Sequence, residues 1–258
     1  MTISNERNPM LRIEREALEG FVLEKFELHK GRCGYRRINH ELRKDGIVVS
    51  GKRVLNVMRE LGLQAKGTTR KHRRAKVIET GDTRVDLVNH IFEVDTRNRL
   101  WVGDITYINT SEGWLYLAAV IDAWHRKVVG WSMSERITEK LVVDALEQAV
   151  SRGDPPADFS LVFHDDQGVQ YTSHAFQRRL ESHGIAQSMS RPGNPWDNTL
   201  AESFFKTLKR EPVKGKEYRT RDEAMQDIFK YIELYYNRHR LHSAIGYNAP
   251  CDLEREAA

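Results

Sequence analysis

The most constraining feature of the sequence is a short apolar run that ends in two adjacent carboxylates. Leu161, Val162 and Phe163 are followed by His164–Asp165–Asp166–Gln167–Gly168. An apolar run of this length, closed by a glycine, is typical of a buried strand. The two acids then lie at the carboxyl end of that strand, which is where open α/β sheets carry their active sites. We therefore expect a sheet with an acidic site at this edge.

Two further acids lie in segments that are predicted to be regular. Asp104 interrupts the otherwise apolar run 100–108, which predicts a central strand, and a lone buried acid costs free energy unless it is paired or binds a metal. On a predicted helix, Glu202, Lys206 and Lys209 form one stripe. Any one of these acids alone is more simply a cap or a surface group. Three acids followed by basic residues instead favour a site for hard divalent cations, which prefer oxygen ligands.

These residues carry a resemblance to a known family. Asp104, Asp166 and Glu202 match the D,D-35-E pattern, because 35 residues lie between the last two, and Lys209 matches the basic residue that follows. The chain resembles the DDE transposases of the retroviral-integrase superfamily, and more closely the second-frame product (OrfB) of the insertion sequence three family. That family usually has serine where this chain has Asp165. The other matching words span residues 101–107, 164–171, 197–205 and 242–247.

The resemblance covers nearly the whole chain, from about residue 30 to about residue 252, and it implies an RNase H-like fold. The elements predicted from the residues follow the order βββαβαβα, which is the order of that fold. The expected fold class is therefore α/β: an RNase H-like mixed five-stranded sheet flanked by helices, with an N-terminal three-helix helix-turn-helix-like domain. The predicted elements span residues 100–108, 114–122, 127–133, 138–151, 161–163, 173–183, 186–189 and 197–209, and a final helix spans about 221–236.

The resemblance also implies an activity. A transposase of this kind is expected to catalyse metal-dependent DNA strand cleavage and strand transfer at insertion-sequence ends, and so DNA integration and recombination. Asp104, Asp166 and Glu202 are implied as the catalytic residues, which hold two Mg²⁺ (or Mn²⁺) ions in each active site. The implied partners are double-stranded DNA (the element ends and the target), further copies of the chain in a synaptic complex, and a first-frame (OrfA) partner or fusion.

Two other functions stay open from the residues alone. One is a hydrolytic nuclease of the RNase H type, which cuts DNA without joining it, although the basic N-terminal helices and Lys209 argue against it. The other is a DNA-binding regulator with an inert catalytic domain, which Asp165 keeps open. Neighbouring residues on a strand point to opposite faces. We therefore expect Asp165 to face away from Asp104 and Glu202, near solvent or His164.

Basic residues are concentrated near the N-terminus. Residues 30–76 contain fifteen Lys or Arg and three acids, a net charge of +12, while the rest of the chain carries −8. Such a segment favours a polyanionic partner, although charge runs are often only solvated surface. Helical spacing over 11–29, 35–45 and 51–61 predicts three helices, typical of a helix-turn-helix module or of an ordinary bundle. The DNA contacts that we expect are Lys52, Arg53, Arg59, Arg70, Arg73, Arg74, Lys206 and Lys209.

The remaining signals concern regions and location. Asp122 ends a predicted strand and is not expected to be catalytic, and Cys33 and Cys251 show no zinc spacing. No apolar run approaches the ~20 residues of a membrane span, and the N-terminus lacks an apolar signal core. We therefore expect a bacterial, cytoplasmic, nucleoid-associated protein without a membrane partner. Four regions are predicted: a helix-turn-helix-like DNA-binding domain (1–65), a basic linker (66–95), an RNase H-like catalytic core (96–215) and a C-terminal helical extension (216–258).

Overall fold

The chain forms two compact units, each with its own apolar core. The computed structural model describes residues 15–66, 94–166, 168–190 and 198–256. The first unit is Met1–His72 and the second is Arg73–Ala258. Among the described residues, no helix combines the length and the apolar character that crossing a membrane would require.

Three short helices build the N-terminal unit: α1 (Arg15–Leu28), α2 (Tyr35–Lys44) and α3 (Gly51–Glu60). Ser50 begins α3, because its Oγ accepts a hydrogen bond from the Arg53 backbone N–H at 3.3 Å. The apolar sides of the helices meet in a small core made of Leu18, Val22, Cys33, Ile38, Leu42, Val49, Val54, Val57 and Met58. The predicted three-helix domain is confirmed.

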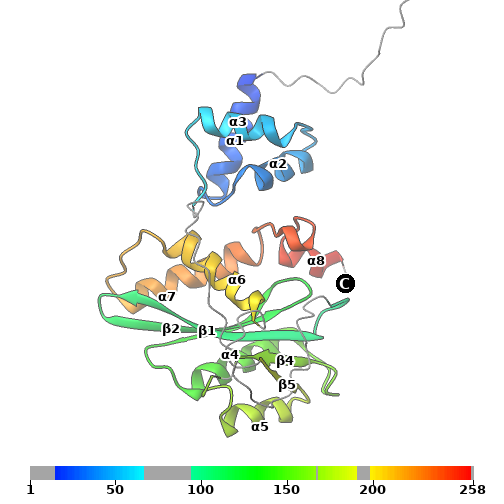
Figure 1. Cartoon of the computed structure of the whole chain (residues 1–258), viewed down its shortest axis with the longest axis vertical. Coiled ribbons are helices and arrows are strands. Elements are labelled where there is room, and N and C mark those ends of the chain that lie inside the picture. The colour runs from blue at the N-terminus through cyan, green and yellow to red at the C-terminus, as the bar shows by residue number, and fades with distance from the viewer. Residues whose placement is uncertain (1–14, 67–93, 167, 191–197, 257–258) are drawn as a thin grey trace, which may run out of the picture. The chain divides into compact units, whose positions relative to one another are not determined.

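A five-stranded mixed sheet is the centre of the second unit (Figure 1). The strands lie in the order β3-β2-β1-β4-β5. The first three form an antiparallel meander, whereas β4 pairs parallel to β1 and β5 pairs parallel to β4. This is the predicted α/β fold. The bounds are β1 Leu100–Thr110, β2 Gly113–Asp122, β3 Val128–Ser134, β4 Val162–Asp165 and β5 Ala186–Met189.

Helices cover both faces of the sheet, with α4 (Glu139–Gly153) and α5 (His174–Ser182) on one side and α6 (Thr199–Leu208) and α7 (Arg221–Phe229) on the other (Figure 1). Side chains of β1 alternate between the two faces. Val102 and Ile108 belong to the core with α6 and α7, while Trp101 belongs to the core with α4 and α5. Even-numbered residues of β1 therefore face α6 and α7, and odd-numbered residues face α4 and α5.

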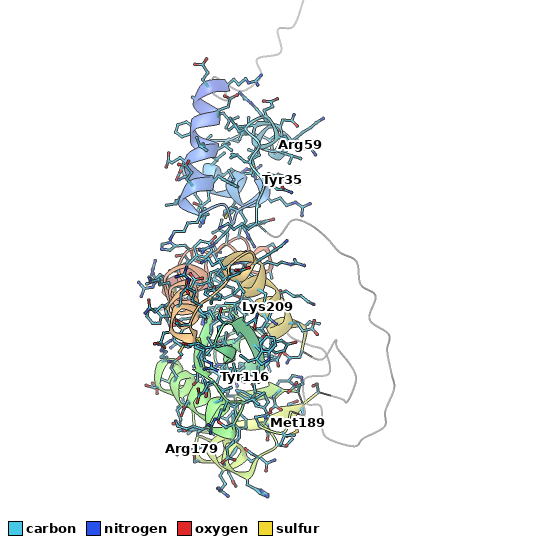
Figure 2. All side chains as sticks on the ribbon, turned by 90° about the vertical axis from the view of Figure 1, so that its left-hand side faces the viewer. Tyr35, Arg59, Tyr116, Arg179, Met189 and Lys209 are labelled. Carbon is cyan, nitrogen blue, oxygen red and sulfur yellow. The ribbon has the colours of Figure 1, made fainter. Side chains whose placement is uncertain are left out.

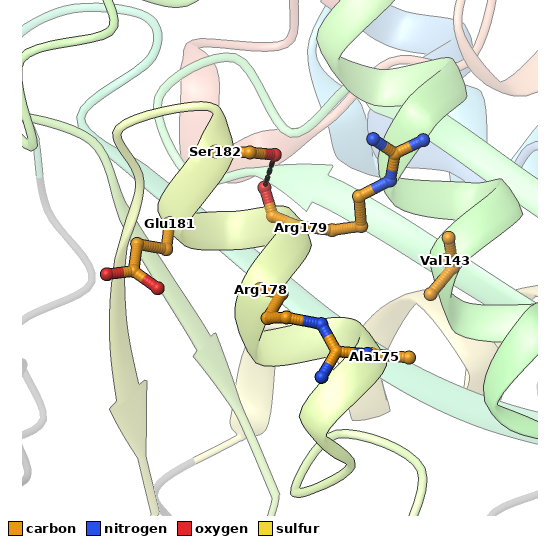
Figure 3. A pocket seen from close by; sticks show the side chains of 6 residues that line it. All are labelled: Val143, Ala175, Arg178, Arg179, Glu181 and Ser182. Atoms are coloured by element: carbon orange, nitrogen blue, oxygen red, sulfur yellow. Dashed lines mark hydrogen bonds between the residues drawn. The ribbon is translucent and has the colours of Figure 1, made fainter.

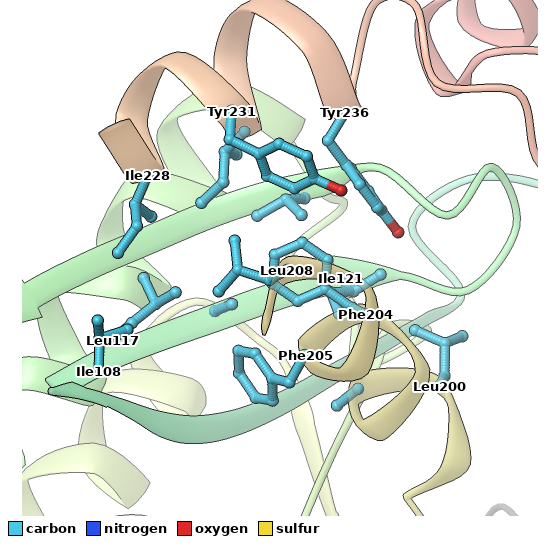
Figure 4. Packing of buried hydrophobic residues seen from close by; sticks show 14 of the residues in the cluster. Ile108, Leu117, Ile121, Leu200, Phe204, Phe205, Leu208, Ile228, Tyr231 and Tyr236 are labelled. Atoms are coloured by element: carbon cyan, nitrogen blue, oxygen red, sulfur yellow. The ribbon is translucent and has the colours of Figure 1, made fainter. Parts of the chain in front are cut away.

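The core beneath α6 is the larger of the two and is rich in aromatic rings (Figure 4). Phe204 of α6 packs edge to face on Tyr236, with ring centroids 4.9 Å apart. Fully burying an apolar side chain of the size of Phe204 or Leu208 stabilises the fold by roughly 1.5–3 kcal/mol. The packing therefore fixes α6 firmly on the sheet, and with it any polar side chain on the same helix.

On the opposite face of the sheet, the backbone of α4 packs very close to the backbone of β3. A Cβ added at Gly130 of β3 would lie 2.2 Å from the Ala145 carbonyl oxygen of α4 and 2.6 Å from the Ala149 nitrogen. No side chain can occupy that space, because both neighbours are main-chain atoms. Gly130 therefore sets the distance between α4 and the sheet.

The C-terminal region departs from a regular helix. The predicted helix over 221–236 is α7 only as far as Phe229, and Lys230–Tyr236 (η2) continues with wider, π-type turns. A similar wide turn, η1 (Lys209–Val213), follows α6 and contains Pro212, which lacks the N–H of a regular helix. The chain ends with a short 3₁₀ turn, η3 (Ser243–Ile245), and α8 (Pro250–Glu256).

A buried ion pair links these segments. Arg240 Nε lies 3.1 Å from the Glu211 Oε1 of η1, and the Tyr231 hydroxyl donates to Glu211 Oε2 at 2.8 Å. Both charged side chains are nearly inaccessible to solvent. The pair therefore ties the residues after α6 to the C-terminal segment through the core.

Candidate active site

Asp104 and Asp166 lie on the sheet face that α6 covers. Asp104 has the parity of Val102 and Ile108, which belong to the core with α6. In the parallel pairing of β1 with β4, Val102 stands opposite His164, so both point to the same face. Asp166 follows His164 by two residues, just past the end of β4, and it is exposed.

Glu202 lies in the first turn of α6 and completes a group of three acids. The helix begins at Asn198, whose carbonyl accepts from the Glu202 N–H at 3.1 Å. Burial raises the pKa of Asp104 to about 7, and the negative charges of Asp166 and Glu202 act in the same direction. Asp104 is thus close enough to Asp166 and to Glu202 to be repelled by both, and its burial disfavours the ionised form.

The basic residues of α6 lie beside this group. Lys206 Nζ donates to Glu202 Oε2 at 2.6 Å, and Lys209 acts on Asp104 by lowering its pKa. The pKa of Lys209 itself is lowered, because burial outweighs the attraction of Asp104. Figure 2 shows Lys209 at the end of α6. Both lysines predicted to contact DNA are therefore neighbours of the acids.

A divalent cation suits this donor set, although the side chains are not gathered around one point. Three carboxylates supply the hard oxygen ligands that Mg²⁺ prefers. Within the ranges that the structure describes, no three Asp, Glu, His or Cys side chains converge closely enough to hold an ion. The Lys206 ammonium contacts Glu202 instead, so a metal would have to compete with that ion pair.

Asp165 occupies the other face of the sheet. Its Oδ2 accepts a hydrogen bond from Gln187 Nε2 at 2.9 Å, and Gln187 stands opposite Phe163 in the core with α4 and α5. The prediction that Asp165 faces away from Asp104 and Glu202 agrees with this contact. Of the two surroundings expected for it, solvent or His164, the first is wrong: Asp165 is 0% exposed.

The cause of that burial is the parallel strand β5, which covers the outer side of β4 and brings Gln187 alongside. Burial raises the pKa of Asp165 well above its usual range, and the single bond from Gln187 does not offset it. Asp165 Oδ1 finds no hydrogen-bond partner among the described residues. Asp165 is therefore a second uncompensated acid, which points to the face opposite to Asp104 but whose pKa is also raised by the neighbouring charge of Asp166.

Three residues support the strand at Asp104. A Cβ at Gly103 would lie 2.4 Å from Phe163 Cζ, so the glycine is needed for the Phe163 ring to pack beneath the strand. Asn198 is buried and its Nδ2 donates a long hydrogen bond of 3.4 Å to the Gly103 carbonyl. No side-chain cap bond is made by Asn198 to α6. The sequence indicated Asn198 only as a candidate cap of this helix, so its contact with β1 is a finding of the structure.

Asp122, in the same sheet, is a buried acid whose carboxylate is fully hydrogen-bonded by its surroundings. Its carboxylate accepts from the backbone N–H groups of Asn98 at 2.8 Å and Trp124 at 2.9 Å, and from Trp101 Nε1 at 3.2 Å. His125 Nδ1 also lies 3.2 Å from Oδ1. Burial raises the pKa of Asp122, but these contacts outweigh it and hold the pKa below the ordinary value.

The remaining predicted DNA contacts lie partly within and partly outside the described residues. Lys52 and Arg59 are exposed on α3, and Arg53 is half-buried there. Arg70, Arg73 and Arg74 fall outside the described residues.

A hollow of about 640 Å³ opens between α4 and α5 (Figure 3). Its lining includes Val143, Arg178 and Arg179, and Arg179 Nε is paired with Glu147 at 2.9 Å. The hollow lies on the sheet face opposite to Asp104, so it is not part of the acidic group.

Known proteins match the chain over most of its length. Models of an integrase core domain match residues 95–195 and 183–250, and a model of an HTH-like domain matches residues 12–72. The transposase for insertion sequence element IS904 of Lactococcus lactis subsp. lactis (strain IL1403) is 46% identical over 243 residues, covering 94% of this chain and 95% of that protein.

More distant matches follow. The transposase InsF for insertion sequence IS3A of Escherichia coli (strain K12) is 40% identical over 245 residues, covering 94% of this chain and 83% of that protein. Among solved structures, the HTLV-2 integrase catalytic core domain in complex with magnesium is 17% identical, with a TM-score of 0.42, and covers 60% of this chain and 94% of that one. A likeness this distant adds no weight to the sequence matches.

Proposed function

This chain belongs to the family of insertion-sequence transposases with an integrase core that includes the IS904 and IS3 proteins, and we propose that Asp104, Asp166 and Glu202 are its catalytic carboxylates. The prediction of a transposase that acts in DNA transposition and integration by strand transfer is confirmed by these relatives. The integrase core makes it a polynucleotidyl transferase. What remains a proposal is which residues perform the reaction, and with which ions.

The observation that carries the proposal is the shared electrostatic field of the three acids. They come from β1, the end of β4 and α6, and the charges of Asp166 and Glu202 both act on Asp104. Asp122 is more deeply buried but is surrounded by hydrogen-bond donors, whereas Asp104 is half-buried and its pKa rises to about 7. Ionising Asp104 costs free energy unless a cation is bound nearby. A half-buried acid of this kind beside two further acids is typical of a cation site.

The chemistry that two bound Mg²⁺ or Mn²⁺ ions would supply is Lewis-acid activation of a water or a DNA 3′-OH and stabilisation of the leaving 3′ oxygen. Asp104, Asp166 and Glu202 would bind these ions. Lys206 would release Glu202 to do so, and Lys206 and Lys209 would then be available to hold DNA phosphates. Asn198 and Gly103 keep Asp104 and the start of α6 in a fixed relation.

The rest of the assembly follows from the same proposal. Residues 1–65, with Lys52, Arg53 and Arg59, and the basic linker 66–95 would bind double-stranded DNA, while 96–215 forms the catalytic core and 216–258 supports it. Joining two element ends requires two active sites, so a homo-oligomer is proposed, together with a first-frame partner or fusion. The protein would act at the nucleoid, in the bacterial cytoplasm.

A cleavage and strand-transfer assay tests the catalytic assignment. The substrate is a duplex that carries an element end, and the variants are Asp104→Asn, Asp166→Asn and Glu202→Gln. Asp144→Asn is the matched control, because Asp144 is an exposed acid paired with Lys140 four residues away, as Glu202 is with Lys206. We expect the three variants to lose cutting and joining in Mg²⁺ and Mn²⁺. Wild-type protein that cuts but never joins would instead indicate a nuclease.

A further inference from the structure

Two large aromatic side chains lie exposed near the acidic group, on the β1–β2 hairpin. Tyr107 is 55% exposed and Trp114 is 47% exposed. Their rings meet edge to face, with centroids 5.0 Å apart and an angle of 80° between the planes. Single exposed apolar side chains are common on protein surfaces, but two exposed aromatic rings in mutual contact form a small contiguous patch, which is the kind of feature that marks a binding surface.

The hairpin that carries the rings is held in place. Its end is joined to the segment before α7, because the Ser111 N–H donates to the Tyr218 carbonyl at 2.9 Å. Arg221 Nε donates to the Trp114 carbonyl at 3.1 Å. The rings are therefore presented on a fixed support, so that binding to them would cost little ordering of the backbone.

Beyond Asp104, no strand among the described residues pairs with the side of β1 that faces β4, and this part of β1 is called the open edge. β4 pairs with β1 only over Leu100–Val102, and within the described residues the next backbone partner on that side is Tyr218, opposite Thr110. Tyr107 lies three residues after Asp104, about 10 Å along the strand at ~3.3 Å per residue. Asp104 and Tyr107 point to opposite faces, so a ligand that contacts both must pass around this open edge.

Lys209 lies near both the acidic group and the aromatic pair. Its Nζ lies 4.6 Å from the centroid of the Tyr107 ring, and it also acts on the charge of Asp104. The same ammonium is thus available to a phosphate at the acidic group and adjoins the aromatic pair. An aromatic surface next to a cation that serves phosphates has the composition of a single-stranded DNA site, in which bases stack on rings and cations follow the backbone.

We propose that Tyr107 and Trp114 form a platform for an unpaired base of the DNA strand whose phosphate lies at Asp104, Asp166 and Glu202; the base stacks on one ring, and the other ring, nearly perpendicular to it, flanks the edge of the base. This inference rests on the proposed function, since it takes the acidic group as the place of the reacting phosphate. The platform holds the nucleotide beside that phosphate and so positions the strand. Bases within a duplex are covered on both faces, which is why an unpaired base is the ligand that fits.

The first test needs no variant. Binding of a duplex with a short single-stranded end is measured without divalent ions, so that no cleavage occurs. Each nucleotide of the single strand is replaced in turn by an abasic analogue. We expect one position to weaken binding by between about fivefold and about a hundredfold, which corresponds to the loss of one base stacked on an aromatic ring. A 2-aminopurine at that position should lose fluorescence on binding, and equal fluorescence at every position would overturn the platform.

The second test assigns the effect to the two rings. Tyr107→Ala and Trp114→Ala should weaken binding of the intact probe and become insensitive to the abasic position. Tyr107→Phe and Trp114→Phe keep a ring and should behave like the wild type. Phe159→Ala is the control, because Phe159 is equally exposed, at 55%, but precedes β4 at the end remote from Asp166. Alanine variants that keep the full abasic effect would show that the base stacks elsewhere.

Two outcomes separate the platform from its alternatives. If the alanine variants change the oligomeric mass and leave the abasic effect intact, the rings form a contact between copies of the chain and the proposal fails. If Asp104→Asn still cleaves DNA while the abasic effect persists and depends on Trp114, the catalytic assignment fails and the platform stands. The phenylalanine variants report on the platform even if an alanine variant does not fold.

Discussion

Asp104 and Asp122 lie on two paired strands and have opposite surroundings. Asp122 ends β2 with three N–H donors and a histidine around its carboxylate, and its pKa is lowered. Asp104 receives one backbone N–H, from Ile105 at 2.7 Å, and faces two other acids. A buried acid that is fully hydrogen-bonded serves the fold, while one surrounded by like charge awaits a ligand. The difference between the surroundings of the two acids supports the proposal that Asp104 belongs to the active site and Asp122 does not.

The largest expected effect is on the chemistry of the acidic group. Asp104→Asn, Asp166→Asn and Glu202→Gln should each lower the rate of cleavage at least about a thousandfold, because several kcal/mol of transition-state stabilisation depends on the ions they hold. Their unfolding free energies should be unchanged or higher, since each removes charge from a repulsive group. The rate is measured in single-turnover cleavage and the stability in urea. A variant with a near-normal rate would remove that residue from the catalytic set.

Asp122→Asn should give the reverse result. The amide cannot accept all the N–H donors around it, and we expect a loss of about 3 kcal/mol in the free energy of unfolding, with the cleavage rate of the folded protein retained. Urea denaturation followed by circular dichroism measures the loss. If the variant is as stable as the wild type, the contrast between Asp122 and Asp104 does not hold.

The pH dependence of stability sharpens the same comparison. The pKa of Asp122 is lowered in the folded protein, so its contribution is complete above its ordinary pKa and is lost as the pH falls through the lowered value. The wild type should therefore lose stability at acidic pH more steeply than Asp122→Asn. Urea midpoints measured from neutral to acidic pH give both slopes, and parallel slopes would contradict the assignment of Asp122.

DNA binding should depend on the N-terminal helices, whereas DNA cleavage should depend on the three acids. Replacing Arg53 and Arg59 together by Gln should weaken DNA binding and reduce the slope of log affinity against log salt by ~0.9 for each lost phosphate contact. The three acid variants should keep the wild-type slope. A salt titration measures it. An unchanged slope in the arginine variant would remove α3 from the DNA interface.

The smallest effect is expected at Asp165. Asp165→Ser should keep or improve Mg²⁺-dependent cleavage, because the side chain lies behind the sheet and ligates nothing, while Asp166→Ser should abolish cleavage. A Mg²⁺ titration of both variants measures this. Loss of cleavage in Asp165→Ser together with activity in Asp166→Ser would reverse the assignment of the two neighbours. Complete inactivity of the wild type, even with a first-frame partner attached, would favour an inert regulator.

Much of the fold followed from patterns that are local in the sequence. Apolar runs located the strands, and the predicted strand 186–189 is β5 as observed. The spacing of 35 residues selected Asp166 over Asp165, and parity then gave their opposite faces. Local patterns do not show what covers a face, however. The burial of Asp165 depends on Gln187, which arrives from another strand.

The features that the sequence did not reveal are contacts between distant segments. Gly103 matters because of the Phe163 ring, and the role of Tyr107 depends on Lys209, about a hundred positions away. The end of α7 at Phe229 is likewise invisible in a continuous apolar pattern, because π-type turns and regular turns place apolar residues at similar intervals.

The buried pair of Glu211 and Arg240 has a consequence for incomplete copies of this protein. A chain that terminates before Arg240 keeps every acid of the site but loses the guanidinium that neutralises Glu211 within the core. Leaving a buried charge without its partner costs about 3–5 kcal/mol, a large part of the stability of an ordinary domain. Products of premature termination should therefore be degraded rather than accumulate, and would not compete with full-length copies for the ends of the element.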